Sequence, residues 1–280
     1  MGSSKDLFLV FGAHVATSWA DWVSYVGALV LLHAMAPRHS FATAGFMVAR
    51  LLPPLLLAPL AHVVAAAFEK RRVLAACNVA GAAVVLGFLG IQRPPQLPSF
   101  YVVATLQQTL FAVYDPTRRA LVPEVCRGND WALTVATAAD AFARSLVMCV
   151  GAVSGGALAT SAAGLPATFA CAAAALTVAA AATLLAARQT VGASRLNLRS
   201  GEDEDGGYGA LASTGAAYLL GPGQRRTLRL LCVKASAAVA WGVADVLEVA
   251  LASQPAAHRW GGFAAPEKIQ QAKDLISPKP

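Results

Sequence analysis

Long apolar runs separated by short polar breaks dominate this chain. A helix needs about 20 mostly apolar residues to cross the hydrocarbon layer of a bilayer, where no water can satisfy exposed backbone groups. Seven runs meet that length, and they cover residues 7–36, 41–67, 73–92, 100–122, 132–160, 165–187 and 228–252. The pattern predicts an all-α, multi-pass membrane helical bundle with seven spans.

The polar segments between these runs divide the chain into four parts. Residues 1–188 hold six predicted spans, and residues 189–226 form a polar, glycine-rich linker with an acidic run at 202–205. Residues 227–252 hold the seventh span. The segment 253–280 loses apolar periodicity, so we expect a disordered tail outside the membrane.

Composition narrows the class of protein. Apolar residues make up 57% of the chain and charged residues only 13%, whereas soluble domains carry roughly 25% charged residues. An ordinary soluble enzyme is therefore disfavoured. A soluble alanine-rich bundle is the alternative, but it needs a polar face on every helix, and the third and sixth predicted spans show none.

The basic residues indicate a membrane orientation. The net charge is +7, but the basic residues fall in clusters between apolar runs and form no continuous stripe for nucleic acid. Lys and Arg in short loops stay on the cytoplasmic side. With the N-terminus inside, the inner loops hold the clusters at 70–72, 118–127 and 188–226, and the outer loops hold only Arg38 and Arg93. We therefore expect an integral membrane protein with a cytoplasmic N-terminus and lipid as its surroundings.

Three short motifs give these spans a family resemblance. Residues 18–23 read Ser-Trp-Ala-Asp-Trp-Val, similar to a Gly-Asp-Trp signature of one transporter branch. Residues 68–72 read Phe-Glu-Lys-Arg-Arg, and residues 114–124 read Tyr-Asp-Pro-Thr-Arg-Arg-Ala-Leu-Val-Pro-Glu. With six spans, a long polar loop and a further span, the chain resembles the major facilitator superfamily of secondary transporters. The motifs are closest to the branch of the enterobactin exporter and the macrolide-efflux permeases.

The resemblance implies an architecture and an activity. Family members hold twelve spans in two six-helix halves and carry substrate near the midplane by alternating access. This chain is similar to the N-terminal half plus the first helix of the second half. We therefore expect a truncated permease that exports a small amphipathic compound, with a second chain as a candidate source of the missing half. The alternative is a non-transporting membrane protein that assembles with or regulates a full-length transporter.

Polar groups at membrane depth are costly, so they mark candidate residues of the substrate pathway. Asp21 and Arg50 both fall near the bilayer centre, where they either pair or face a shared polar cavity. Asp140 and Arg144 lie four residues apart on one helical face, where they either neutralise each other or line the pathway. The substrate-pathway candidates are Asp21, Arg50, Gln107, Asp140, Arg144, Lys234 and Asp245.

The resemblance also implies a charged gate on the cytoplasmic side. Family members carry an aspartate after the second span that belongs to a charge network joining the two halves, and this chain has Ala66 in its place. The remaining candidates for the cytoplasmic gate are Glu69, Lys70, Arg71, Arg72, Asp115, Arg118 and Arg119.

Glycines of the fifth span are candidates for close helix packing. Gly151, Gly155 and Gly156 match a family glycine motif, and the G-x-x-x-G spacing of the first two lets a second backbone approach. Helix packing and helix bending are both open readings of this motif.

Motifs of other chemistries are missing from the sequence. The chain shows no catalytic triad, phosphate-binding loop, dinucleotide fingerprint or metal-ligand spacing. We therefore expect no enzyme activity, no cofactor, no metal site and no nucleic-acid partner.

Overall fold

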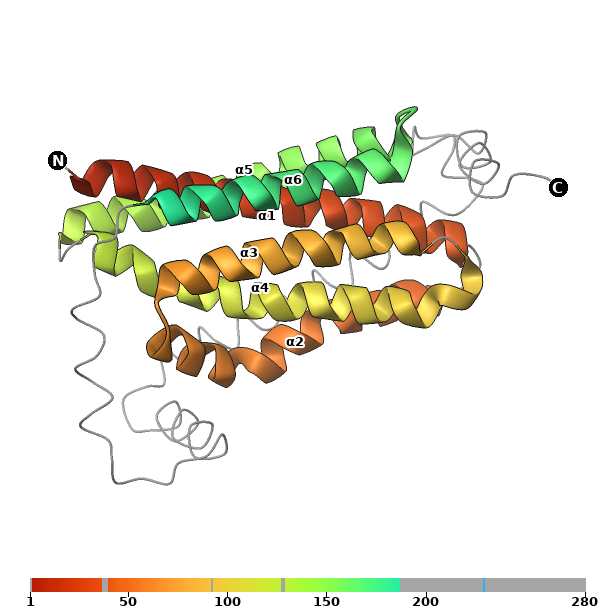
Figure 1. Ribbon diagram of the computed structural model, residues 1–280, viewed down its shortest axis with the longest axis horizontal. Coiled ribbons are helices and arrows are strands. Elements are labelled where there is room, and N and C mark those ends of the chain that lie inside the picture. The colour runs from red at the N-terminus through yellow and green to blue at the C-terminus, as the bar shows by residue number, and fades with distance from the viewer. Residues whose placement is uncertain (1, 37–39, 92, 127–128, 187–228, 230–280) are drawn as a thin grey trace, which may run out of the picture. The chain divides into compact units, whose positions relative to one another are not determined.

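Six α-helices follow the first six predicted spans (Figure 1). The computed structural model describes residues 2–36, 40–91, 93–126, 129–186 and 229. The helices are α1 (Gly2–Met35), α2 (Ser40–Ala67), α3 (Lys70–Gly87), α4 (Leu97–Cys126), α5 (Asp130–Thr160) and α6 (Gly164–Leu185), with short 3-10 turns η1 (Phe88–Gly90) and η2 (Pro94–Gln96). No strand occurs among the described residues, which confirms the all-α prediction for this part of the chain.

The helices differ in how well they could cross a membrane. Four segments are long and apolar enough, namely Lys5–Met35, Lys70–Gly90, Asp130–Thr160 and Gly164–Leu185. In α2 the apolar stretch is shorter and covers Phe41–Leu57. α4 has 30 residues, but it carries two glutamines and three charged residues between 107 and 119, which lower its mean hydropathy.

Consecutive helices run in opposite directions (Figure 1). α2 packs mainly on α4, whereas α1 packs mainly on α5 and α6. α3 packs against α4 and α6. Three contacts between consecutive helices are sparse by comparison, those of α1 with α2, of α2 with α3 and of α4 with α5. We call the first and the last of these the α1–α2 seam and the α4–α5 seam.

Two glycines of α5 let α1 come close. A Cβ atom at Gly151 would lie 2.6 Å from Trp22 Cβ, and one at Gly155 would lie 3.1 Å from Val23 Cα. The first distance is too short for a side chain and the second is tight, so these two glycines lie at the α1–α5 contact. Gly156, the third predicted packing residue, is half-buried beside them.

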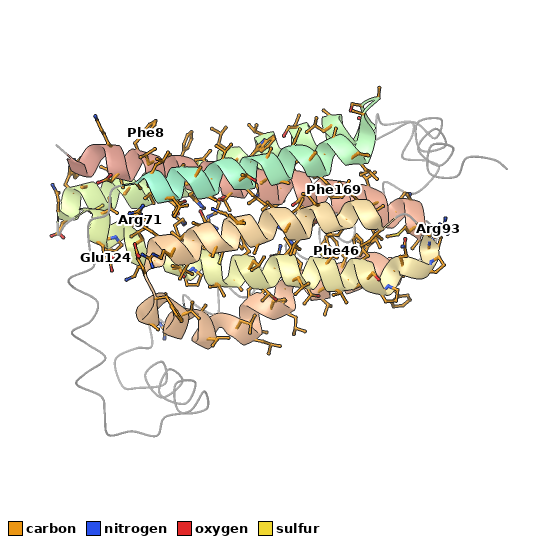
Figure 2. The ribbon with its side chains drawn as sticks, viewed as in Figure 1. Phe8, Phe46, Arg71, Arg93, Glu124 and Phe169 are labelled. Carbon is orange, nitrogen blue, oxygen red and sulfur yellow. The ribbon has the colours of Figure 1, made fainter. Side chains whose placement is uncertain are left out.

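The two ends of the bundle are built differently. In the half that ends at Arg93, four aromatic rings pack in series with centroid separations of 5.1 to 5.5 Å, and they are Phe46, Phe100, Phe88 and Phe169 (Figure 2). The opposite end, where α1 begins, carries Arg71 and Glu124 (Figure 2). We call the two ends the Arg93 end and the N-terminal end. Aromatic packing thus prevails toward one end and charged contacts toward the other.

Several predictions fall outside the described residues. They are the linker 189–226, the tail 253–280 and the pathway candidates Lys234 and Asp245. Within the predicted seventh span 227–252, the structure describes only Arg229.

Candidate functional site

Asp21 of α1 and Arg50 of α2 form an ion pair in the middle of the bundle. Arg50 Nη2 donates to Asp21 Oδ2 over 2.5 Å, and the Arg50 guanidinium carbon lies 4.4 Å from the centre of the Tyr25 ring. The side chains of Arg50 and Asp21 are 17% and 12% exposed. Water screens such a buried pair only weakly. The pair is therefore a strong polar link across the α1–α2 seam.

Two amides of α4 complete the surroundings of Asp21. Gln107 Nε2 and Gln108 Nε2 donate to Asp21 Oδ1 over 3.4 and 3.3 Å. Gln107 Nε2 also donates to Ser24 Oγ over 2.7 Å. The charge of Asp21 is thus matched by Arg50, and its second oxygen is occupied by amide donors. We call Asp21, Arg50, Gln107 and Gln108 the Asp21 junction, and it joins α1, α2 and α4.

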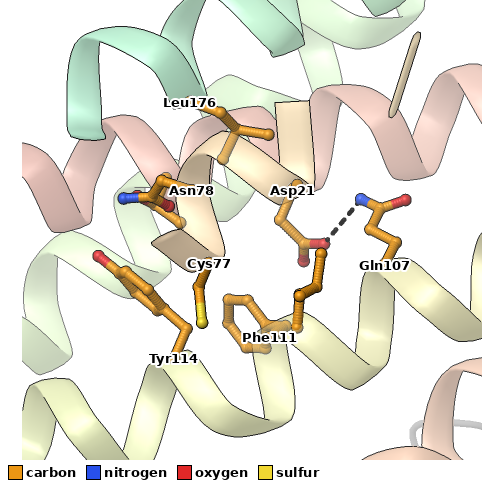
Figure 3. A pocket seen from close by; sticks show the side chains of 10 residues that line it. Asp21, Cys77, Asn78, Gln107, Phe111, Tyr114 and Leu176 are labelled. Atoms are coloured by element: carbon orange, nitrogen blue, oxygen red, sulfur yellow. Dashed lines mark hydrogen bonds between the residues drawn. The ribbon is translucent and has the colours of Figure 1, made fainter. Parts of the chain in front are cut away.

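A small pocket lies beside this junction (Figure 3). Thr17, Asp21, Asn78 and Tyr114 supply its polar lining. Its volume is about 30 Å³, and one water molecule needs at least about 10–15 Å³ of such space. The pocket is therefore large enough for water but too small for a transported organic molecule.

Asn78 brings an unsatisfied polar atom to this pocket. Its Nδ2 is buried and has no hydrogen-bond partner within the part of the chain that the structure describes. Thr17 Oγ1 lies 2.9 Å from Ala13 O and 3.1 Å from Asn78 Oδ1, but one hydroxyl hydrogen can serve only one of these oxygens. Water in the pocket would satisfy the Nδ2 donor of Asn78.

A second charged cluster lies between α4 and α5, toward the N-terminal end. Arg118 binds Asp140 with both terminal nitrogens, Nη1 to Oδ1 over 2.8 Å and Nη2 to Oδ2 over 3.1 Å. Asp115 accepts from Arg119 Nε over 2.9 Å and from Arg118 Nη2 and Arg144 Nη2 over 3.3 Å each. We call these five residues the arginine cluster. Three guanidinium groups share two carboxylates there, and the side chain of Arg118 is only 4% exposed.

His14 of α1 joins the arginine cluster from a third helix. Its Nε2 lies 3.1 Å from Asp140 Oδ1, and its side chain is 2% exposed. The imidazole also stacks near Tyr114, with ring centroids 6.4 Å apart. His14 is not among the site residues predicted from the sequence, because an isolated histidine in an apolar run carries no signal for a specific partner.

Charged side chains at the start of α3 hold the ends of two other helices. Arg71 Nε donates to Thr183 O over 3.2 Å, and Arg71 Nη2 donates to Leu184 O. Lys70 Nζ donates to Glu124 Oε1 over 2.6 Å. The carbonyls at a helix C-terminus lack partners within the helix and carry partial negative charge, so a guanidinium caps them well. At the N-terminal end of the bundle, the start of α3 thus ties the last turn of α6 to the last turn of α4.

The predicted pathway residues divide between the two sites. Asp21, Arg50 and Gln107 meet at the Asp21 junction, where Asp21 pairs with Arg50 and where Asp21 and Gln107 border the pocket. Asp140 and Arg144 lie in the arginine cluster instead. Their closest approach to each other is 3.8 Å, and Asp140 contacts Arg118 more closely.

The predicted gate residues also have different surroundings. Asp115, Arg118 and Arg119 belong to the arginine cluster, and Lys70 and Arg71 make the contacts of α3 with α4 and α6. Glu69 pairs with Arg72 over 2.7 Å, but the Arg72 side chain is 81% exposed. An ion pair so open to solvent contributes little.

An internal repeat relates the two charged sites. Asp115 and Arg144 follow Asp21 and Arg50 by 94 residues, and the two members of each pair are 29 residues apart. α6 begins 94 residues after α3, and α4 and α5 begin within a few residues of the same offset from α1 and α2. At this offset α2 and α5 share eight identical positions, which are Ala42 and Ala136, Thr43 and Thr137, Ala44 and Ala138, Ala49 and Ala143, Arg50 and Arg144, Leu52 and Leu146, Ala58 and Ala152, and Ala65 and Ala159.

The packing of the helices follows the same repeat. Exchanging α1 with α4, α2 with α5 and α3 with α6 turns the α2–α4 contact into the α5–α1 contact, and both are extensive. The same exchange turns the α1–α2 seam into the α4–α5 seam. α1 and α4 run in opposite directions, so the repeat is inverted (Figure 1). This repeat is the sequence signal that would have paired Arg144 with Asp115.

Comparison of the chain with protein-family models, curated proteins and solved structures finds no match. The class of protein therefore rests on the structure itself. The described part of the chain is an all-α bundle in which four helices are long and apolar enough to cross a membrane. That bundle is compatible with an integral membrane protein.

Proposed function

We propose that the described bundle is a six-helix half of a secondary transporter of the major facilitator type. In this proposal it takes part in the export of a small amphipathic compound by alternating access, driven by an ion gradient. The observation that carries the proposal is the inverted repeat of three helices with an Asp–Arg pair at the same position in each copy. Inverted three-helix repeats nested within six-helix halves are the building plan of that superfamily.

The motifs of the sequence support the same assignment. The stretch 18–23 contains Asp21 of the junction, and the stretch 114–124 contains Asp115 and two arginines of the arginine cluster. Asp21, Asp115 and Arg118 thus belong to the motifs that carry the family resemblance, and each makes a buried or partly buried ion pair.

The Asp21 junction supports a role in the transport pathway. An ionised side chain at membrane depth costs roughly 2.5 to 3.5 kcal/mol on insertion scales, so it marks a functional site by default. Asp21 and Arg50 neutralise each other, yet both keep some exposure and Asp21 borders a polar pocket. We assign Asp21, Arg50 and Gln107 to the pathway and the arginine cluster to the neighbouring gate.

The distribution of charge supports a cytoplasmic N-terminal end. Figure 2 places Arg71 and Glu124 at that end and Arg93 at the other, and Lys70, Arg72, Arg118 and Arg119 lie in the same parts of α3 and α4 as Arg71 and Glu124. Loops with more Lys and Arg stay inside. We therefore assign the Arg93 end to the outer side of the membrane.

Flux measurements test the proposal directly. The full chain is reconstituted into liposomes, a pH gradient is imposed, and the movement of ethidium, a rhodamine dye and a macrolide is followed. We expect gradient-dependent flux of at least one compound above that of protein-free liposomes. In Asp21→Asn the flux should fall about ten-fold or more, since ten-fold corresponds to about 1.4 kcal/mol of barrier. Arg93→Gln, which changes an exposed residue outside both sites, should leave the flux unchanged.

The alternative function is that of a membrane protein that does not transport but assembles with a second chain. It predicts no flux from the purified protein and the appearance or change of flux only when a partner bundle is added. The same liposomes therefore decide between the two functions, and equal flux with and without the imposed gradient would contradict the proposed transporter.

A further inference from the structure

The arginine cluster carries a positive charge that its own carboxylates do not neutralise. Its three guanidinium groups share the carboxylates of Asp115 and Asp140. Three positive and two negative groups leave one positive charge unmatched while the neighbouring His14 is neutral. An unmatched charge at membrane depth is costly, because lipid tails cannot hydrate it. An anion that binds to the cluster would remove that cost.

The repeat shows that this excess of charge belongs to the second copy alone. The ion pair of Asp21 and Arg50 in the first copy is neutral. Three charged residues of the arginine cluster have uncharged residues at the matching positions of the first copy, which are Ser24 for Arg118, Tyr25 for Arg119 and Phe46 for Asp140. The first copy thus packs its helices without the two additional arginines, so the repeated packing alone does not explain them.

Two of the three guanidinium groups are open to the surroundings of the described helices. The side chains of Arg144 and Arg119 are 40% and 56% exposed, whereas that of Arg118 is 4% exposed. At a rise of 1.5 Å per residue, Arg144 lies about 2 Å from the midpoint of α5 and Arg119 about 11 Å from that of α4. Both depths fall within a hydrocarbon layer about 30 Å thick. Exposed guanidinium groups at this depth indicate a water-filled space, because contact with lipid tails would be unfavourable.

The two exposed guanidinium groups keep unused hydrogen-bond donors. Arg144 donates to Asp115 through Nη2, and Arg119 donates to it through Nε. No other nitrogen of these two groups donates a hydrogen bond to a residue that the structure describes. A planar guanidinium can bind a carboxylate with two parallel N–H donors. Ala141, one turn before Arg144, is exposed and has only a methyl side chain, so a ligand has room beside Arg144.

We propose, in an inference that rests on the proposed transport function, that Arg119 and Arg144 bind the carboxylate of an amphipathic solute that the protein exports. The carboxylate accepts hydrogen bonds from the free donors of both guanidinium groups and neutralises the excess charge of the cluster. Arg118 stays bound to Asp140 and Asp115. In the proposed orientation the cluster lies toward the cytoplasm, where an exported solute enters. The site therefore favours amphipathic carboxylates over neutral compounds of the same shape.

A carboxylate probe and its neutral amide test this site. The full chain is placed in nanodiscs of phosphatidylcholine, and dansylglycine and dansylglycinamide are titrated separately while dansyl fluorescence is recorded. Empty nanodiscs give the background from lipid. The probes differ only in the charged group, so their difference in affinity measures recognition of the carboxylate. We expect dansylglycine to bind at least about ten-fold more tightly than the amide, because hydrogen bonds between charged groups are stronger than neutral ones.

Variants of the two arginines locate the binding. Arg144→Gln and Arg119→Gln should each weaken the binding of dansylglycine about ten-fold and leave that of the amide unchanged. Arg72→Gln removes a positive charge from an 81% exposed side chain outside the cluster and should change neither affinity. Ala141→Glu provides a second test if an arginine variant does not fold. It places a carboxylate one turn before Arg144, where it should compete with the probe and weaken its binding by a similar factor.

An anionic lipid headgroup is the other source of a negative group for this site. The titration of dansylglycine is therefore repeated in nanodiscs that also contain phosphatidylglycerol, with high salt in both series to screen the surface charge of the lipid. Unchanged affinity supports a solute as the ligand. Loss of binding in the presence of phosphatidylglycerol would assign the site to a lipid headgroup and overturn the proposed solute. Equal affinities of the two probes, or an equal loss in Arg72→Gln, would overturn the carboxylate site itself.

The test of binding is separate from the test of transport. Dansylglycine also joins the compounds of the flux measurement. Carboxylate-selective binding without flux of any compound would keep the site and reject the transporter. Flux of the other compounds together with equal binding of the two probes would keep the transporter and reject the site.

Discussion

Asp21 shows how one carboxylate can connect three helices. It pairs with Arg50 of α2 and accepts hydrogen bonds from Gln107 and Gln108 of α4. The depth of each residue follows from its position along its own helix, so the sequence could predict that Asp21 and Arg50 lie at similar levels. It could not predict the two amides as partners, because the choice of neighbouring helices is made by packing.

Removing Arg50 should destabilise the bundle strongly. In Arg50→Ala the carboxylate of Asp21 loses its charged partner in a poorly hydrated site, and breaking a buried ion pair costs about 3 kcal/mol or more of unfolding free energy. Unfolding of the purified protein in detergent, followed by circular dichroism, measures this loss. Arg93→Ala, at an exposed position, serves as the control and should change the value by less than about 0.5 kcal/mol. Equal losses in the two variants would contradict the pairing.

The glycines of α5 and α1 should respond oppositely to a methyl group. In Gly151→Ala the new Cβ would meet Trp22 at 2.6 Å, and overpacking of this kind costs about 1–3 kcal/mol. Gly12 of α1 has no atom within 4 Å of the same position, so Gly12→Ala should stabilise the helix by about 0.5–1 kcal/mol. The same unfolding measurement gives both values. A stable Gly151→Ala variant would show that α1 and α5 are not in close contact there.

Among the elements, the apolar runs set the limits of the helices well. All six predicted spans within the described part of the chain correspond to helices, with ends that differ by a few residues. The length and apolar composition that a membrane span needs are properties of one continuous segment. Each apolar run therefore predicts its own helix without reference to the rest of the chain. The ties between elements are different, since Arg71 on α3 caps the end of α6 more than a hundred residues later.

The cap that Arg71 makes on α6 should protect the end of that helix. In Arg71→Ala the carbonyls of Thr183 and Leu184 lose their donor, so the last turn of α6 should open more often. Hydrogen exchange of the amides in this turn should accelerate about ten-fold, which corresponds to about 1.4 kcal/mol. Arg72→Ala removes the adjacent, 81% exposed arginine and should leave the exchange unchanged. Equal acceleration in both variants would indicate a general effect of charge.

For the whole molecule, the surface gives the clearest indication of its surroundings. Large apolar side chains are widely exposed on the described helices, among them Phe41 at 90% and Phe142 at 71%. Water-soluble monomers rarely expose large apolar patches, whereas lipid contacts such side chains at no cost. The charged residues gather mainly toward the N-terminal end instead of covering the helices.

The proposed orientation should be visible in intact cells or sealed vesicles. A cysteine introduced as Arg93→Cys should react with a membrane-impermeant maleimide from the outside, and one introduced as Arg72→Cys should react only after the membrane is opened. Both positions are exposed in the structure, so the difference would reflect sidedness and not burial. The opposite pattern would place the N-terminal end outside and contradict the orientation drawn from the positive charges.

The sequence by itself determined the six described helices and the position of each polar residue along its helix. The length of an apolar run and the rise per residue of a helix do not depend on contacts with other helices. Both can therefore be used for prediction before any helix contact is known. The repeat of 94 residues was also present in the sequence, but its meaning depends on which helices pack together.

The tertiary structure decided which polar groups meet. Asp140 and Arg144 share a helical face, yet Asp140 binds Arg118 and His14, and Arg144 lies closest to Asp115. A pair at four residues' spacing gains little on its own helix, whereas Arg118 can bind a carboxylate of the next helix with two nitrogens. Which polar side chains meet between two helices depends on the rotation of each helix about its axis and on the angle at which the helices cross. The packing of all the apolar helix surfaces sets both of these.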